Sequence, residues 1–338
     1  MHIPETGSSA LRLLAFLALI NFVVPQCSRK SSPVIFNFGD SNSDTGGFIA
    51  GVGLDIGYPY GRTFFRRPTG RASDGRLVID FLCEYLGTHY LSPYLDSLEP
   101  DFTNGANFAI VGATILPKYV PFNLGIQILQ FKHFYNRSIE LHSRGRMNLL
   151  GKDDFKNALY TLDIGQNDLS GSFGSLSYAQ VIEKIPSFIS EIKDAMWAIY
   201  ELGGRNFWVH NTGPLGCLPR ELAIRSSGNA SDYDEYGCMK SLNEGAKAFN
   251  GKLQALCGEL RSQMQNSTIV YVDVYSIKAD LRHIIDKRVM GSLALPTLRN
   301  TMSCRSRCRS PRLRQGTELL LQQPFWGHSL NRLRGKRV

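Results

Sequence analysis

The sequence predicts an α/β protein, a three-layer sandwich in which helices cover both faces of a central parallel sheet of about five strands. From residue 33 onward, short apolar runs alternate with longer helical stretches, and each run is followed by a loop that contains glycine. Strands separated by helices connect through right-handed crossovers, which produce a parallel sheet. In such sheets, ligands bind at the carboxyl ends of the strands.

The first part of this pattern supplies two strands and one well-marked helix. The run 34–38 ends at Gly39, and the run 107–111 ends at Gly112. Between them, Asp74 is expected to cap a helix that Gly87 ends. The apolar residues of that helix recur on one face, as in a helix packed on a sheet, at Leu77, Phe81, Leu82, Tyr85 and Leu86.

The second part repeats the pattern three times. Further strands are predicted at 159–164, 206–211 and 268–274. The stretch 178–202 predicts a long helix interrupted near Pro186, and the stretch 232–264 predicts another. Because no linker occurs before about residue 282, residues 29–281 are expected to form a single domain.

The positive charge of the chain is concentrated in one segment. The formal net charge is +9, but residues 282–338 alone carry 13 Lys or Arg and 2 Asp or Glu, so the remainder is close to neutral. A nucleic-acid-binding protein carries its positive charge on the folded recognition surface, so this distribution argues against one. The Arg-rich segment has no periodic apolar face and is expected to be disordered.

The N-terminus is typical of a secretory signal peptide, which we expect to span residues 1–28. The stretch Leu11–Val24 is almost wholly apolar but is too short to cross a bilayer, so no stable membrane anchor is predicted. Three Asn-x-Ser/Thr sites, at Asn136, Asn229 and Asn266, fit a glycoprotein that passes through the secretory pathway. The protein is therefore expected to be secreted.

The chain has seven cysteines without any C-x-x-C pair, so a zinc site is not predicted. In an oxidising compartment some of them would pair. Cys238 and Cys257 flank one predicted helix and are possible partners.

The candidate catalytic segment is FGDSNSDTGG, residues 38–47, which directly follows the first predicted strand. A serine at a strand-to-helix turn presents its hydroxyl at the carboxyl edge of the sheet, where helix amides can hold an oxyanion. The same residue types also make ordinary polar turns. A calcium loop is excluded because Gly51 stands where the bidentate Glu is needed, and neither a G-x-S-x-G elbow nor a phosphate-binding loop occurs.

Five segments in order resemble the plant GDSL esterase/lipase family over residues 33–281: GDSNSDTGG, SDGRLVIDFL, GANFAIVGATILP, DIGQND and NTGPLGCLP. The resemblance implies an SGNH-hydrolase fold with flavodoxin-like strand order. It also implies a secreted, extracellular ester hydrolase of the cell wall or apoplast. Such an enzyme acts through an acyl-enzyme without a metal or cofactor.

Three residues carry the roles that the family implies. Ser41 would be the nucleophile, and its backbone N–H would donate to the oxyanion. Gly112 would donate a second backbone N–H, and Asn167 would donate from its side-chain amide, which stabilises negative charge without titrating. Asp168 is expected to be a local hydrogen-bond acceptor rather than a catalytic group.

The family supplies its base from an Asp-x-x-His motif near the C-terminus, and the resemblance fades at about Asp280, before such a block. Asp280 and His283 have the spacing, but they follow the fifth predicted strand too closely. His328 lacks the aspartate, and His210 is expected to be a polar residue at a strand end. Residues 282–338 resemble nothing in the family, as a shifted reading frame or altered gene end would produce.

Three functions therefore stay open. The first is a serine esterase/lipase acting on acetylated sugars, acyl lipids or cutin-like polyesters, with specificity set by Ile49–Arg67 and Pro117–Met147. The second is a catalytically impaired relative that acts as a binding protein or is a non-functional truncated product. The third is a glycosidase, because GDSNSDTGG resembles a subgroup labelled fucosidase-like, although no carboxylate pair is marked. The sequence predicts no oligomeric state.

Overall fold

A parallel five-stranded sheet forms the centre of the protein, as the computed structural model shows for residues 33–98, 100–117, 121–146, 148–225 and 228–281. The strands are β1 (Ile35–Gly39), β2 (Gly105–Asn107), β3 (Leu159–Asp163), β4 (Asn206–His210) and β5 (Thr268–Val272). Their order is β2-β1-β3-β4-β5, and every neighbouring pair is parallel. The predicted α/β class and flavodoxin-like order are confirmed.

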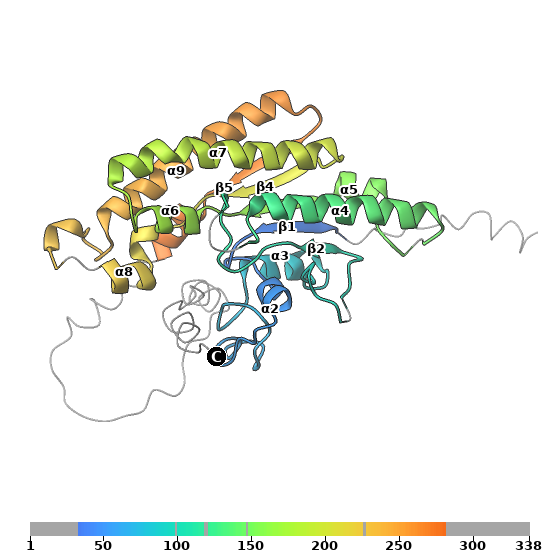
Figure 1. The fold of residues 1–338 in the computed structure, drawn as a ribbon, viewed down its shortest axis with the longest axis horizontal. Coiled ribbons are helices and arrows are strands. Elements are labelled where there is room, and N and C mark those ends of the chain that lie inside the picture. Colours follow the sequence, from blue (N-terminus) through green and yellow to red (C-terminus); the bar gives the residue numbers. More distant parts are fainter. Residues whose placement is uncertain (1–32, 99, 118–120, 147, 226–227, 282–338) are drawn as a thin grey trace, which may run out of the picture. The chain divides into compact units, whose positions relative to one another are not determined.

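Helices cover the sheet (Figure 1). They are α2 (Gly47–Val52), α3 (Val78–Leu86), α4 (Leu124–Ser143), α5 (Lys152–Asn157), α6 (Gln166–Ser172), α7 (Tyr178–Glu201), α8 (Pro219–Arg225) and α9 (Lys240–Gln263). Residues 274–281, after β5, are also helical. Helices α4, α7 and α9 lie along one face of the sheet, and α3 lies on the other.

Successive side chains of β1 point to opposite faces of the sheet, and both faces carry apolar residues that helices cover. Phe36 and Phe38 point into a large core shared with α4, α7 and α9, whereas Ile35 packs with the residues of α3. The Phe36 ring stacks 5.1 Å from that of Phe155 and 5.4 Å from that of Tyr160. A strand buried on both sides gives the loop that follows it a rigid base.

The predicted second strand, 107–111, is misplaced: β2 spans Gly105–Asn107 and shares only Asn107 with the predicted range. The amide of Val111 donates to the Asp44 carboxylate at 2.7 Å, so the chain bends toward the loop after β1. The sequence pattern could not show this long-range contact.

Three helix boundaries also differ from the prediction. Asp74 is not a cap, since α3 begins at Val78, where the amide of Leu77 donates to Asp80; Gly87 ends this helix as predicted. Pro186 lies inside α7 without ending it, because buried residues on both sides of the proline hold the helix on the core. Helix α9 begins at Lys240.

The predicted Cys238–Cys257 pairing is wrong. Cys238 is bonded to Cys217, with 4.4 Å between the Cα atoms, whereas Cys257 is a free buried thiol in α9. The disulfide joins the loop after β4 to the residues before α9, and the amide of Met239 donates to Gly216 beside it. Burial raises the pKa of the Cys257 thiol to about 11, so this thiol is unreactive.

The predicted signal peptide and the Arg-rich segment lie outside the described residues, as do His283 and His328. Among the helices that the structure describes, none has the length and apolar character needed to span a bilayer.

Candidate active site

The loops after β1, β2 and β3 bring the three predicted site residues to the carboxyl edge of the sheet. The side-chain amide of Asn167 donates to the Ala113 carbonyl at 2.9 Å and to Asp40 Oδ2 at 3.3 Å. Ala113 follows Gly112, and Asp40 precedes Ser41. One amide therefore joins the loop of the candidate nucleophile to the loop of the candidate oxyanion glycine.

Asp40 and Gln127 hold the backbone around Ser41. Asp40 Oδ1 accepts from the backbone amide of Asn42 at 2.9 Å and from its side-chain amide at 3.0 Å. Gln127, on α4, bonds both the amide and the carbonyl of Gly39, at 2.9 and 2.8 Å. No local pattern marks Gln127, because its partner is 88 residues away.

Asp44 fixes the other end of the same loop. Its carboxylate accepts from the backbone amides of Gly46, Gly47, Phe48 and Val111, at 2.6 to 3.1 Å. Burial raises the pKa of Asp44 to about 6, while the four amides oppose that shift. The carboxylate thus ties the start of α2 to the loop that carries Gly112.

The two backbone oxyanion donors that the family implies, the amides of Ser41 and Gly112, lie in the loops that these contacts hold. Gly112 has φ +80°, a left-handed conformation that glycine adopts without strain. Within the part of the chain that the structure describes, the backbone amides of Ser41 and Gly112 donate to no acceptor, and the Ser41 hydroxyl has no partner. Two free amides beside a serine and a side-chain amide match the chemical requirement of an oxyanion hole.

Asp168 has the local role that the sequence predicted. Its carboxylate accepts from the amides of Ile115 and Leu116, at 2.8 and 3.3 Å. It is buried and braces the loop that follows Gly112.

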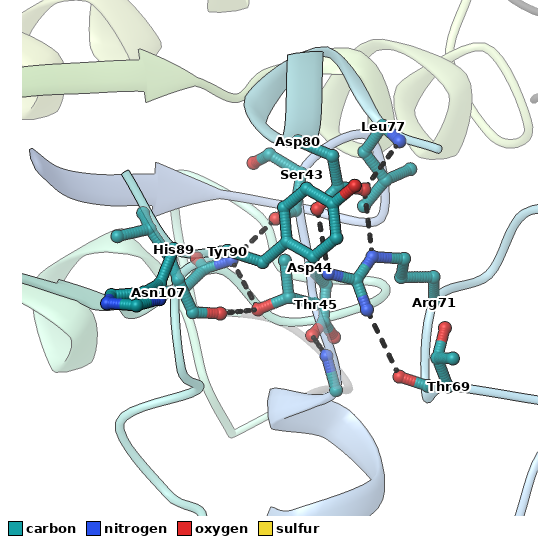
Figure 2. Close-up of polar contacts among 12 residues, drawn as sticks. Ser43, Asp44, Thr45, Thr69, Arg71, Leu77, Asp80, His89, Tyr90 and Asn107 are labelled. Carbon is teal, nitrogen blue, oxygen red and sulfur yellow. Dashed lines mark hydrogen bonds and ion pairs between the residues drawn. The ribbon is translucent and has the colours of Figure 1, made fainter. Parts of the chain in front are cut away.

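A second polar network involves the end of the Ser41 loop and the residues around α3 (Figure 2). Arg71 donates to both carboxylate oxygens of Asp80, at 2.8 and 2.7 Å, and both side chains are buried. Asn107 donates to the Ser43 carbonyl and to the Thr45 hydroxyl, at 2.7 and 2.9 Å. These contacts make the segment SDGRLVIDFL and its neighbours part of the scaffold rather than of the reacting centre.

No described histidine lies beside Ser41 as its base. His210 ends β4, where a polar strand-end residue was predicted, and its Nδ1 lies 3.6 Å from Asp163 Oδ2 at the end of β3. Because β3 separates β4 from β1, the Asp163 carboxylate stands between His210 and the strand of Ser41. Asp280 is exposed in the helical residues after β5.

A pocket of about 310 Å³ opens at the same edge of the sheet, beyond β4 and β5. Its lining combines tyrosines with charged and amide side chains, including Tyr236, Tyr275, Asp234, Glu244 and Asn243. In the described residues, no group of three or more His, Cys, Asp or Glu side chains could hold a metal ion.

Comparisons with known proteins agree with this geometry. Residues 35–285 match the family model described as GDSL-like Lipase/Acylhydrolase. A GDSL esterase/lipase of Arabidopsis thaliana is 58% identical, covering 80% of this chain and 74% of that protein. An Arabidopsis protein named Alpha-L-fucosidase 3 is 48% identical over 74% of this chain and 70% of its own length. A protein of Hevea brasiliensis named Esterase is 42% identical over 83% of this chain and 74% of its own length.

Proposed function

The chain belongs to the GDSL-like lipase/acylhydrolase family, a family of serine hydrolases that act on carboxylic esters, and we propose that it does so through an acyl-enzyme on Ser41. One observation carries the proposal. The free backbone amides of Ser41 and Gly112 lie in loops that the Asn167 amide joins.

In the proposed reaction, the Ser41 oxygen bonds to the ester carbonyl carbon while its proton passes to a base. The two free amides donate to the negative oxygen of the tetrahedral intermediate, and Asn167 exchanges its longer bond, to Asp40, for a bond to the same oxygen. The carbon–oxygen bond to the alcohol then breaks, the alcohol leaves with the proton, and water hydrolyses the acyl-enzyme. The base is not assigned by the described residues, and Asp280 with His283 stays a hypothesis.

The proposal is tested by hydrolysis of p-nitrophenyl acetate. Ser41→Ala should lower kcat by at least ~1000-fold, because removing a nucleophile leaves only the oxyanion hole and binding. Ser43→Ala is the matched control, since its hydroxyl lies two residues away and forms no hydrogen bond in the described structure. Equal rates for the wild type and Ser41→Ala would instead support the binding-protein or non-functional alternative.

One observation favours the glycosidase alternative and another argues against it. Asp40 and Asp163 are neighbouring carboxylates at the sheet edge, where the amide of Asp40 donates to the Asp163 carbonyl. However, the Asp40 side chain is fully buried and both its oxygens accept from amides, so it cannot protonate a glycosidic oxygen. Cleavage of a fluorogenic fucoside that survives Ser41→Ala but not Asp163→Asn would favour the glycosidase.

Among possible esters, we favour a hydroxylated leaving group such as a sugar over a long acyl chain. The pocket beyond β4 and β5 supports this choice, because tyrosine faces beside carboxylates and amides suit hydroxyl groups. A higher kcat/KM for acetylated xylose than for a p-nitrophenyl ester of a long fatty acid is expected. The reverse order would argue for a lipase.

Secretion is part of the proposal. The Cys217–Cys238 disulfide is typical of an oxidising compartment, and the three glycosylation sequons, at Asn136, Asn229 and Asn266, are all exposed. Expression in plant cells should place the protein in the apoplast, with a mass that falls on enzymatic deglycosylation. Retention in the cytosol would contradict this part.

A further inference from the structure

A buried ion network joins helix α8 to helix α6, the short helix that carries Asn167 in its first turn (Figure 1). The Glu221 carboxylate of α8 is 1% exposed and accepts from the Ser170 hydroxyl of α6 at 2.7 Å. Arg220 and Arg225, also on α8, each donate to this carboxylate at 2.6 Å. A buried carboxylate with three donors is held in one geometry, and here one of those donors belongs to α6.

Arg225 binds the C-terminal end of α6. Its guanidinium donates to the carbonyls of Ser170 and Phe173, at 2.7 and 2.9 Å. The last carbonyls of a helix lack amide partners within the helix, and a cation beside them is favourable. A Cβ atom at Gly174 would lie 3.5 Å from the Arg225 guanidinium, so this group sits directly against the backbone that leaves α6. Arg225 therefore caps α6, and Glu221 fixes the position of Arg225.

Helix α6 depends on such contacts because it is short. It has seven residues, and no side chain caps its first turn. A helix of this length is not stable by itself and takes its position from tertiary contacts. Its first turn is bound to the loop after β2, where Asn167 donates to the Ala113 carbonyl at 2.9 Å. Asp168 accepts from the Ile115 amide in the same loop. The network on α8 fixes the opposite end of α6.

The Cys217–Cys238 disulfide attaches α8 to the rest of the fold. Helix α8 begins at Pro219, directly after the loop that contains Cys217. The disulfide bonds this loop to the residues before α9, and beside it the Met239 amide donates to the Gly216 carbonyl at 2.9 Å. Because α8 is tethered in this way, its contacts with α6 fix α6 relative to α9.

We propose that Glu221 is a positioning residue for the candidate oxyanion amide: by binding Ser170 and Arg225 it fixes α6, and with it the direction in which Asn167 donates. The carboxylate acts through α6 and not by contact with the substrate. The consequence for catalysis rests on the proposed esterase function. The coupling between α8 and α6 does not, so it can be measured whether or not the chain hydrolyses esters.

The first test follows hydrogen exchange of the full chain by mass spectrometry. Glu221→Gln keeps the size of the side chain but removes its charge, so the bonds to Arg225 weaken and α6 is held less firmly. The peptide 166–173 should exchange at least about 10-fold faster, whereas peptides from the middle of α7 and α9 should be unchanged. Ser170→Ala removes only the hydroxyl bond between the two helices and should speed exchange of the same peptide by a smaller factor.

Ser138→Ala is the matched control for the exchange test. It removes a buried serine hydroxyl of the same kind, which donates to the Leu150 carbonyl at 2.9 Å from α4, so exchange of 166–173 should stay at the wild-type rate. Faster exchange confined to 219–225 in Glu221→Gln, with 166–173 unchanged, would overturn the proposal.

The second test measures hydrolysis of p-nitrophenyl acetate in a double-mutant cycle with Asn167→Ala. Glu221→Gln alone should lower kcat by about 10-fold, part of the roughly 100-fold effect of one oxyanion donor, and should leave KM within about twofold. In the chain that already carries Asn167→Ala, Glu221→Gln should lower kcat by less than about twofold more, because the amide that it positions is gone.

A merely structural role for Glu221 predicts a different result. A smaller folded fraction would lower kcat by the same factor with or without the Asn167 amide, and that outcome would overturn the proposal. An inactive wild type would instead overturn the esterase function, and the exchange test alone would then decide whether Glu221 fixes α6.

Discussion

The two sides of the site treat their charged groups differently. On the side of β1 and β2, every buried charge has direct partners: Asp44 binds four backbone amides, and Arg71 binds Asp80 through two hydrogen bonds. At the ends of β3 and β4, by contrast, two charged groups meet in a longer contact, since Asp163 Oδ2 lies 3.6 Å from His210 Nδ1.

The comparison distinguishes charged groups that stabilise the fold from charged groups whose ionisation depends on their neighbours. A buried carboxylate that four amides satisfy is committed to one geometry, and removing it leaves all four without an acceptor. A carboxylate that faces another carboxylate changes its ionisation when that neighbour changes. Substitutions on the first side should therefore cost stability, and substitutions on the second should change pH dependence.

The largest effect is expected from Asp44→Ala. Asp44 would no longer accept from four backbone amides, two of them in buried contacts, so the free energy of unfolding should fall by about 3–5 kcal/mol. Urea unfolding at pH 7 measures the change, and Asp55→Ala, at an exposed position after α2, is the matched control. A loss below about 1 kcal/mol would show that the two sides do not differ in this way.

A smaller effect, on rate rather than stability, is expected from Asn167→Ala. Removal of one oxyanion donor lowers kcat by about 100-fold, and stability should change by only about 1–2 kcal/mol for the two hydrogen bonds lost. The control is Asn206→Ala, which removes an amide that bonds the Asn157 and Ala158 carbonyls away from the site. If both variants kept wild-type kcat, Asn167 would not be an oxyanion donor.

The smallest effect is expected from His210→Leu. Neither ring nitrogen of this buried histidine has a hydrogen-bond partner among the described residues, so an apolar side chain should change the free energy of unfolding by less than about 1 kcal/mol. Ester hydrolysis should persist, because Asp163 separates His210 from β1. Loss of kcat without loss of stability would identify His210 as the missing base.

Local patterns predicted the fold and the candidate residues where neighbours in sequence decide the outcome. The apolar runs marked four of the five strands, whereas β2 lies mostly before its predicted range; the polar loops that follow three of the runs marked Ser41, Gly112 and Asn167. The prediction failed where contacts between residues far apart in the sequence decide the structure. The amide of Val111 leaves the predicted strand to bind Asp44, and Cys238 pairs with Cys217 because two loops meet.

The contact of Gln127 with Gly39 and the pairing of Asp163 with Asp40 were not predictable for the same reason. Gln127 binds Gly39 across 88 residues. Asp163 lies inside the predicted strand 159–164, and its charge matters only once the sheet places it beside Asp40. Such contacts depend on the order of the strands and not on any local motif.

Labelling with a fluorophosphonate tests the central claim most directly, because the reagent forms a covalent bond only with an activated serine. Mass spectrometry of the labelled full chain should find the adduct on Ser41. Ser41→Ala should abolish the adduct, and Ser43→Ala should retain it. A chain that stays unlabelled, or an adduct on another residue, would contradict the assignment of Ser41 as the nucleophile.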